Sequence, residues 1–404
     1  MIQQTRGARL VTQHPHLMAN YGRLELNIVR GEGCWLYDES GNAYLDLVAG
    51  IAVCALGHAH PRIARAIAEQ AATLVHVSNL VHHEPAGTLA DRLAALSGFD
   101  TVFFCNSGSE ANEAAIKLAR KRAYRRREPQ RNVILAARGA FHGRTMGSLT
   151  ATDNPKYHEG FEPLPAGFAH VTFNDIDALD AAIDETTACF LVEPVQGESG
   201  VVPATQEYLE AARRLCDERG ALLIFDEVQC GMGRLGRLFA HQVYDVRPDA
   251  FTLAKSLGNG LPIGALLVRG EAATALRPGD HGTTFGGSCV PAAAALEHLA
   301  IRDVIDLDAQ VTAVGGLLRD ELAAIAAEFP TVFETPRGIG FMLGLPVREP
   351  YVAGDFVTAA LDQNLFINAA GRNTLRFIPP LIISADEVRE GMQRLRATIA
   401  SVVH

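Results

Sequence analysis

Short apolar runs alternate with amphipathic segments along the middle of this 404-residue chain. Runs rich in β-branched and aromatic residues predict strands buried on both faces, at 101–105, 132–136, 189–192, 221–225, 250–254 and 264–268. Helical spacing of apolar residues predicts helices at 61–77, 84–97 and about 205–219, the last two ending at Gly98 and Gly220. Buried strands separated by helices are typical of an α/β fold with a mostly parallel sheet.

The pattern changes after Pro291. A long helical region to about residue 329 leads into a segment that mixes short strands and helices. Ser384 and Glu387 then have capping-box spacing at the start of a last amphipathic helix. We therefore expect a large α/β domain at 61–300 and a small α+β domain that combines the N-terminal segment 1–60 with the C-terminal part 301–404.

The composition is that of a globular protein with a large core, with 48% hydrophobic and 20% charged residues and a mean hydropathy of +0.09. A net charge of −10 argues against binding to nucleic acid or anionic membranes. The N-terminus has no signal-peptide core, and the most apolar stretch, 47–56, is too short to span a bilayer. The seven cysteines are scattered without a CxxC pair, which disfavours a disulfide framework or a metal site. We expect a cytoplasmic protein.

The residues that follow each apolar run are the candidates for binding or catalysis, because ligands of parallel α/β sheets bind beyond the carboxyl ends of the strands. Ser107, Gly108 and Ser109 follow the run 101–105 and precede a helix, where backbone N–H groups suit a phosphate. The same residues could form an ordinary helix cap, since Ser107 and Glu110 have capping-box spacing.

Two charged positions follow later runs. Asp226 and Glu227 follow the run 221–225, which matches a Walker B strand, but no GxxxxGK[ST] loop accompanies it. Lys255 follows the apolar residues 250–254, where burial disfavours the ammonium form, although it could simply be the first residue past a strand. A phosphate-binding turn, an aspartate and a lysine at successive strand ends are together what pyridoxal 5′-phosphate requires. The lysine forms a Schiff base, and the aspartate keeps the pyridine nitrogen protonated.

The chain resembles the class III (subgroup II) aminotransferases, which use pyridoxal 5′-phosphate, over nearly its whole length. The motifs that carry this resemblance include NSGSEANEAAIKLAR, FHGRT, EPVQGESGV, LLIFDEVQCGMGR, LAKSLGNGLPIGA, HGTTFGG and INAAGRNTLRFIPPL, in this order. The resemblance implies a fold type I transferase with a mostly parallel seven-stranded sheet in its large domain. Within the family, the chain is most similar to members that transfer the δ-amino group of N2-acetyl-L-ornithine to 2-oxoglutarate in arginine biosynthesis, yielding N-acetyl-L-glutamate 5-semialdehyde and L-glutamate.

The resemblance also implies roles toward the cofactor. Lys255 would be the catalytic Schiff-base lysine, and Asp226 the partner of the pyridinium nitrogen. Gln229 would hydrogen-bond the ring hydroxyl, and Phe141 would stack on the ring. The remaining contacts would come from Ser107, Gly108, Ser109, Val228 and the partner subunit's Thr284, so that a homodimer is part of the expected active site.

Roles toward the substrates follow from the same resemblance. Arg144 would bind the substrate carboxylate far from the reacting amine, with Thr283 beside the substrate. Arg376 would bind the α-carboxylate of glutamate, and Glu198 would pair with Arg376 when the amine donor is bound. Alternatively, Glu198 and Arg376 could be a structural ion pair, Phe141 plain core and Thr283 a turn residue.

Several alternatives remain open at this stage. The same chemistry could act on succinylornithine, succinyldiaminopimelate, ornithine or 4-aminobutyrate. The fold could also support an aminomutase or a decarboxylase, or a module that binds the cofactor without catalysis. Two departures bear on the substrate: Ser288-Cys289 follows FGG where Asn-Pro is usual in the family, and Val81-His82-His83 follows SNL where an aromatic residue is common.

Overall fold

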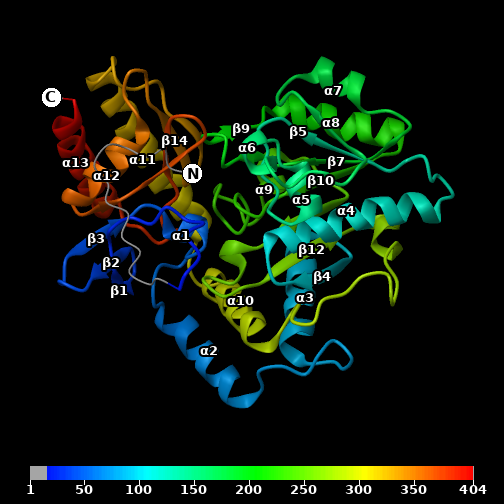
Figure 1. Cartoon of the computed structure of the whole chain (residues 1–404). Helices are drawn as coiled ribbons and strands as arrows, with labels where there is room; N and C mark the ends of the chain where they lie inside the picture. The colour runs from blue at the N-terminus through cyan, green and yellow to red at the C-terminus, as the bar shows by residue number, and fades with distance from the viewer. Residues whose placement is uncertain (1–15, 404) are drawn as a thin grey trace. The chain divides into compact units, whose positions relative to one another are not determined.

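The computed structural model describes residues 16–403, which form two compact units (Figure 1). The large unit comprises Pro61–Ser199 and Pro203–Asp308. The described part of the small unit comprises 16–60, together with Gly200–Val202 and 309–403. Within the described residues, no helix is long and apolar enough to cross a membrane, and no cluster of side chains could hold a metal ion.

The large unit is built on a seven-stranded sheet with the order β4-β12-β11-β10-β7-β5-β6. Its strands are β4 (Thr101–Cys105), β5 (Val133–Ala137), β6 (Phe168–Val171), β7 (Thr187–Val192), β10 (Leu222–Asp226), β11 (Ala250–Leu253) and β12 (Gly264–Val268). β12 is antiparallel to both of its neighbours, and the other neighbouring pairs are parallel. The expected mostly parallel, seven-stranded sheet is therefore confirmed.

Each apolar run of the sequence forms a strand close to its predicted position. β7, β10, β11 and β12 are buried along their whole length, which explains why their sequences are apolar without alternation. The sequence pattern missed β6, because this edge strand is short, only partly buried and contains the polar residue His170.

The helices of the large unit are α2 (Pro61–Thr73), α3 (Glu84–Ser97), α4 (Gly108–Arg125), α5 (Met146–Ala151), α6 (Pro155–His158), α7 (Ile176–Ala182), α8 (Gln206–Arg219), α9 (Ala240–Tyr244) and α10 (Cys289–Arg302). α3 and α8 end at the predicted glycines, because Gly98 and Gly220 adopt left-handed φ values of 71° and 73°. α2 ends at Thr73, earlier than the predicted residue 77.

The alternation of side chains along the strands assigns different helices to the two faces of the sheet. Ile224 of β10 packs in one core cluster with Ala115 of α4. Phe190 of β7 points to the opposite face, where its ring contacts Tyr208 of α8. Asp226 lies two residues after Ile224, so its side chain points to the α4 face.

The small unit contains two four-stranded sheets. The first has the order β1 (Ile28–Glu32), β2 (Trp35–Asp38), β3 (Ala43–Asp46) and β15 (Leu365–Phe366), and the second β13 (Arg337–Ile339), β14 (Met342–Pro346), β17 (Thr374–Phe377) and β16 (Asn368–Ala370). Its helices are α1 (Ala49–Ala52), most of α11 (Leu307–Glu328), α12 (Ala353–Asp362) and α13 (Ala385–Val402). β15 pairs with β3, so segments far apart in the sequence share one sheet. The predicted capping box of Ser384 and Glu387 is confirmed at the start of α13.

A left-handed turn is the most unusual backbone feature of the small unit. Ala49, Gly50, Ile51 and Ala52 all have positive φ, between 51° and 65°. Each such residue with a side chain costs roughly 1–2 kcal/mol. The buried carboxylate of Asp46 supports the turn by accepting the amides of Val48 and Ala49 at 2.8 and 2.9 Å. Its other oxygen lies 2.7 Å from Nε2 of His58.

We expect this pair to make the stability of the protein depend on pH. Burial by itself lowers the pKa of His58, but the hydrogen bond to Asp46, together with a smaller contribution from Cys54, raises it to about 9, from an ordinary value of 6.5. The stabilisation is therefore complete below pH 6.5 and is lost as the pH rises through about 9. The free energy of urea unfolding should fall over this interval by on the order of 2 kcal/mol more in the wild type than in His58→Gln. Equal losses in both proteins would contradict this assignment.

Candidate active site

The edge at which the parallel strands end carries most of the residues singled out in the sequence. β4 leads into 107–109, β5 into 141–144, β7 into 193–198, β10 into 226–229 and β11 into Lys255. Because these strands run in the same direction, the five segments lie along one edge of the sheet. Asp226 pairs in register with Thr252, so the predicted aspartate ends one strand and the predicted lysine follows the adjacent strand.

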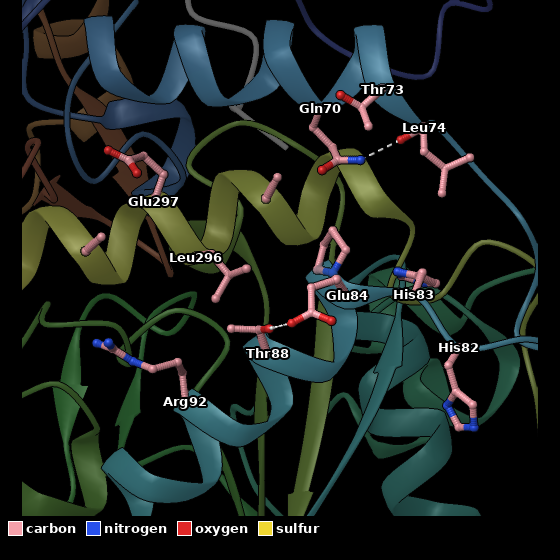
Figure 2. Close-up of a pocket in the computed structure, with 13 residues that line it drawn as sticks. Gln70, Thr73, Leu74, His82, His83, Glu84, Thr88, Arg92, Leu296 and Glu297 are labelled. Atoms are coloured by element: carbon pink, nitrogen blue, oxygen red, sulfur yellow. Dashed lines mark hydrogen bonds between the residues drawn. The ribbon is translucent and has the colours of Figure 1, made fainter.

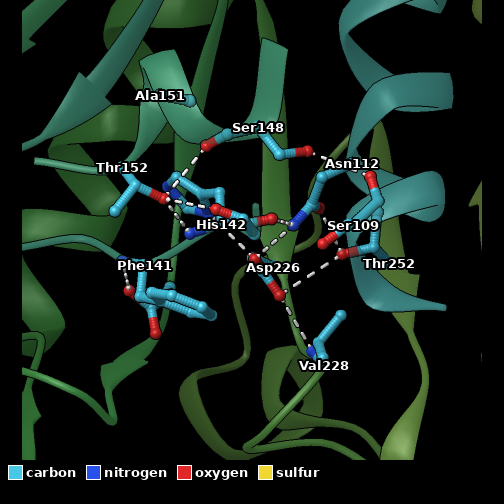
Figure 3. Close-up of polar contacts among 12 residues, drawn as sticks. Ser109, Asn112, Phe141, His142, Ser148, Ala151, Thr152, Asp226, Val228 and Thr252 are labelled. Atoms are coloured by element: carbon cyan, nitrogen blue, oxygen red, sulfur yellow. Dashed lines mark hydrogen bonds and ion pairs between the residues drawn. The ribbon is translucent and has the colours of Figure 1, made fainter. Parts of the chain in front are cut away.

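The buried carboxylate of Asp226 is the centre of a hydrogen-bond network at this edge (Figure 3). Its Oδ2 accepts a hydrogen bond from Asn112 Nδ2 at 2.7 Å and lies 2.8 Å from His142 Nδ1. Its Oδ1 accepts the amide of Val228 at 3.0 Å. A buried carboxylate persists as an anion only where donors replace the lost water. The network therefore holds a negative charge on the α4 face of the sheet.

The Asn112 amide is oriented in turn by Thr252 of β11. The Thr252 hydroxyl donates to Asn112 Oδ1 at 2.9 Å, which leaves Asn112 Nδ2 to donate to Asp226 and to the His142 carbonyl oxygen at 2.8 Å. The hydroxyl also lies 3.4 Å from Asp226 Oδ1, but its single proton serves the nearer acceptor. The side chain of Asn112 thus joins three elements around the carboxylate.

The turn between β4 and α4 corrects one detail of the sequence analysis. Ser107 caps α4, because its Oγ accepts the amide of Glu110 at 3.2 Å. The Glu110 carboxylate, however, accepts the amide and side-chain nitrogen of Asn106 at 2.7 and 2.8 Å instead of the Ser107 amide. Only half of the predicted capping box forms, and the start of α4 keeps the backbone N–H groups that suit an anion.

Glycines let neighbouring segments approach this turn closely. A Cβ on Gly108 would lie 2.7 Å from Cγ1 of Val228. A Cβ on Gly264, the first residue of β12, would lie 2.8 Å from Sγ of Cys105. Since real Cβ atoms essentially never come within 3.0 Å of another atom, a side chain at either position would displace the turn.

The loop before α10 is fastened beside the same turn. Asn106 Nδ2 donates to Thr283 Oγ1 at 3.0 Å. Asn79 Nδ2 donates to the carbonyl oxygens of Thr283 and Gly286 at 3.2 and 3.1 Å. Thr283 therefore lies next to the β4–α4 turn, and Thr284 is exposed.

Lys255 begins a short 3₁₀ turn, Lys255–Leu257, directly after β11. Its φ of 45° lies in the left-handed region, which is uncommon for a residue with a side chain. His298 Nδ1 lies 2.8 Å from the carbonyl oxygen of Ser256, a contact that holds the turn in place. Strained backbone of this kind clusters at functional sites, where the surrounding structure maintains it.

Glu193 is a second buried carboxylate at this edge. It accepts the amide of Phe141 at 2.9 Å and that of Gly197 at 3.3 Å, and so connects the segments that follow β5 and β7. Burial raises its pKa to about 7, with the nearby charge of Asp226 acting in the same direction and His142 opposing it. The structure thus places two carboxylates with different surroundings at the same edge.

Comparison with known proteins agrees with this geometry. The Aminotransferase class-III family profile matches residues 17–399. The chain belongs to the class-III aminotransferases. It is 48% identical to the acetylornithine aminotransferase of Gloeobacter violaceus, over 95% of this chain and 96% of that protein. Among solved structures, it is similar to N-acetylornithine aminotransferase from Stenotrophomonas maltophilia, with 40% identity, a TM-score of 0.83 and coverage of 94% and 96% of the two chains. It is also similar to ornithine aminotransferase from Toxoplasma gondii, with 32% identity, a TM-score of 0.92 and coverage of 96% and 93%.

In this class-III aminotransferase, the two residues expected to act as a switch lie in different units. Glu198 belongs to the large unit, where its Oε1 accepts a hydrogen bond from Gln229 Nε2 at 3.3 Å. Arg376 belongs to the small unit, where it is buried on β17 and donates from Nε to Oδ1 of Asn368 at 3.3 Å. Asn368 is the register partner of Arg376 on β16.

The aminotransferase also has a groove that is separate from the strand-end edge (Figure 2). It has a volume of about 720 Å³ and is lined by residues of α2, α3 and α10 and by His82 and His83. No predicted cofactor or substrate residue lines it. His82 and His83 are two of the residues at which the sequence departs from the family pattern. These two departures therefore line the groove.

Sequence reasoning missed several residues that support this site. Asn112 and Thr252 looked like ordinary helix and strand residues. The period-two alternation of β10 and β11 could have placed Thr252 near Asp226, but no pattern in the sequence places Asn112 there. His142, in the motif FHGRT, contacts Asp226 through its ring. Glu193 was assigned no chemistry, and its contacts are with backbone amides that no spacing rule identifies.

We expect Thr252→Val to lower the free energy of unfolding by about 1–3 kcal/mol, because valine keeps the shape but leaves Asn112 Oδ1 buried without its donor. Thr150→Val is the matched control, since the buried Thr150 hydroxyl donates only to the Met146 carbonyl oxygen of its own helix. Chemical denaturation measures both variants. A Thr252→Val loss no larger than that of the control would show that the network does not depend on this hydroxyl.

Proposed function

We propose that this aminotransferase uses pyridoxal 5′-phosphate to transfer the δ-amino group of N2-acetyl-L-ornithine to 2-oxoglutarate. The products would be N-acetyl-L-glutamate 5-semialdehyde and L-glutamate, as in arginine biosynthesis. The observation that carries the chemistry is the buried, anchored Asp226 at the end of β10, next to β11, the strand after which Lys255 follows. The acetylornithine aminotransferases among the relatives support the choice of substrate.

The residues at the sheet edge fit the proposed cofactor. The N-terminus of α4 offers backbone donors at Gly108 and Ser109 for a phosphate. Asp226 offers an anion that can keep a ring nitrogen protonated, and its donors prevent the carboxylate from turning away. Phe141 offers an aromatic face from a backbone held by Glu193. In the proposal, Gln229 and Val228 complete the contacts with the ring.

When bound, pyridoxal 5′-phosphate supplies an aldehyde that accepts the amino group and a protonated ring that withdraws electrons from the substrate. Lys255 has the reactive role among the protein groups. Its Nζ, as the free amine, removes the proton from the substrate carbon that bears nitrogen. The short turn that starts at Lys255 fixes the backbone position from which the side chain that carries Nζ extends. The left-handed φ of Lys255 directs the chain away from the strand.

The substrate carboxylates are assigned to the two arginines. We assign Arg144 to the carboxylate of acetylornithine, with Thr283 beside that substrate, and Arg376 to the α-carboxylate of glutamate. Glu198 would neutralise Arg376 when the amine donor is bound, because that donor presents CH₂ where glutamate presents a carboxylate. The exposed Thr284 would complete the phosphate site of a neighbouring copy, so the active protein would be a homodimer.

The proposed compartment is the cytoplasm. The seven cysteines are all described, and all are free thiols, as expected where disulfides are kept reduced.

A second donor, unacylated ornithine, is favoured by one observation. The TM-score with the Toxoplasma ornithine aminotransferase, 0.92, is higher than that with the Stenotrophomonas N-acetylornithine aminotransferase, 0.83. Sequence identity ranks the two in the opposite order, at 32% and 40%. Overall similarity of the backbone does not report on the few side chains that choose a substrate, so we prefer the acylated donor and test both.

The deciding experiment mixes purified holoenzyme with N2-acetyl-L-ornithine, succinylornithine, ornithine or 4-aminobutyrate in the absence of ketoacid. The conversion of the bound cofactor from its aldehyde form to its amine form is followed by absorbance. We expect the fastest conversion with N2-acetyl-L-ornithine, and its reversal by 2-oxoglutarate. Lys255→Ala should bind the cofactor without turning over, because it lacks the Nζ amine.

Either of two outcomes would change the proposal. Faster conversion with another amine would keep the chemistry and replace the substrate. Full turnover by Lys255→Ala would remove Lys255 from the mechanism.

Glu198→Ala should change the balance between the two half-reactions. Without this carboxylate, Arg376 would stay unneutralised, which favours glutamate and disfavours the δ-amine donor. We expect the ratio of kcat/KM for glutamate to kcat/KM for N2-acetyl-L-ornithine to rise by about tenfold or more, the equivalent of about 1.4 kcal/mol. Single-turnover kinetics with each donor measures the ratio. An unchanged ratio would show that Glu198 does not act as a switch.

A further inference from the structure

Arg144 has an uncommon environment for an exposed arginine. Its guanidinium carbon lies 3.5 Å from the ring centroid of Tyr157 and 5.6 Å from that of Phe141. Within residues 16–403, Arg144 makes no ion pair and no side-chain hydrogen bond. Its backbone amide donates to Ser109 Oγ at 3.2 Å, which ties its position in the chain to α4.

This arrangement leaves the polar part of the guanidinium available. An aromatic ring that stacks on a guanidinium covers its flat face, whereas the N–H donors point outward in the plane of the group. A carboxylate binds in that plane, through two parallel hydrogen bonds. Stacking on Tyr157 therefore removes rotational freedom from Arg144 without using any of the donors that a substrate would need.

Tyr157 itself is held by its surroundings. It lies on α6, a short helix whose N-cap Asn154 accepts the amide of Lys156 at 3.2 Å. His158, the next residue, places Nε2 within 2.9 Å of the Leu149 carbonyl oxygen and 2.8 Å of the Thr152 carbonyl oxygen. The Tyr157 ring also packs at right angles to Phe141, at 6.2 Å between centroids and 86° between planes. The ring is thus fixed beside both Arg144 and the aromatic side chain assigned to the cofactor.

We propose that Tyr157 is a positioning residue for substrate specificity. Its ring holds the Arg144 guanidinium so that the in-plane donors meet the carboxylate of the amino donor that lies far from the reacting amine. This inference rests on the proposed function, because it takes Arg144 to be the group that binds this carboxylate. In this proposal Tyr157 acts on the carboxylate through Arg144, whereas any effect through its contact with Phe141 would alter both kinds of donor equally.

The test compares two amine donors that differ in a single group. N-acetylputrescine is N2-acetyl-L-ornithine without its carboxylate. Tyr157→Leu removes the aromatic face, and Tyr157→Phe keeps it. Tyr124→Leu is the matched control, since Tyr124 is exposed on α4 and carries a comparable cation, Lys121, at 5.6 Å from its ring centroid.

In Tyr157→Leu we expect KM for N2-acetyl-L-ornithine to rise by about two- to fivefold, in line with an exposed cation–π contact, with little change in kcat. KM for N-acetylputrescine should not change, Tyr157→Phe should behave as the wild type, and the control should have no effect. An independent readout is the calorimetric Kd of N-acetyl-L-norvaline, which keeps the carboxylate and lacks the amine. This Kd should weaken by a similar factor in Tyr157→Leu.

The outcomes separate this inference from the proposed function. Equal loss for both donors in Tyr157→Leu, or failure of Tyr157→Phe to restore the wild-type values, would mean that Tyr157 has only a structural role and would overturn the inference. If wild type and Arg144→Ala show the same preference between the two donors, Arg144 does not bind the carboxylate and the inference fails with that assignment. If the wild type does not use N2-acetyl-L-ornithine at all, it is the proposed function that fails first.

Discussion

The burial of one negative charge, that of Asp226, is the constraint on which this active site depends. A carboxylate in the interior must be surrounded by donors, and these donors come from α4, from the segment after β5 and from the backbone after β10. Each of these elements therefore has to be in place before the charge is tolerated. The same contacts that solvate the carboxylate also assemble the edge of the sheet at which the cofactor is proposed to bind.

The two buried carboxylates of this edge illustrate how environment separates similar groups. Asp226 is surrounded by side-chain and backbone donors, one of them the ring of His142. Burial raises the pKa of Glu193 to about 7, the nearby charge of Asp226 acts in the same direction, and its two backbone amides oppose the rise only in part. The donors around Asp226 fix its carboxylate at the site, and Glu193 fixes the backbone on both sides of the site.

Much of the fold could be predicted from the sequence, because fully buried strands leave continuous apolar runs and glycines mark the ends of helices. β10 and β11 were found in this way, as were the ends of α3 and α8. The edge strand β6 was not found, because its sequence is short and not uniformly apolar. The antiparallel direction of β12 could not be predicted either, because a fully buried strand has a continuous apolar sequence whether it is parallel or antiparallel to its neighbours.

The sequence located the proposed site residues that follow strands, and it missed residues that reach the same edge of the sheet from the side. Asp226 and Lys255 could be identified from their position after apolar runs. Asn112 and Tyr157 act through contacts that form only once α4 and α6 pack, so their sequence neighbourhoods contain no sign of them. The half-formed capping box at Ser107 has a similar cause, because Asn106 competes for Glu110 in a way that spacing alone does not reveal.

The reversal of β12 has a consequence for anyone who diversifies this protein by mutagenesis. Because β12 is antiparallel, it enters the sheet at the edge where the other strands leave it, and its first residue, Gly264, meets the β4–α4 turn. A library that varies the residues after each strand would treat Gly264 as a simple loop position. It should instead be kept constant together with Gly108, since the space that a Cβ would take is occupied by Ser107 and Cys105 at Gly264 and by Val228 at Gly108.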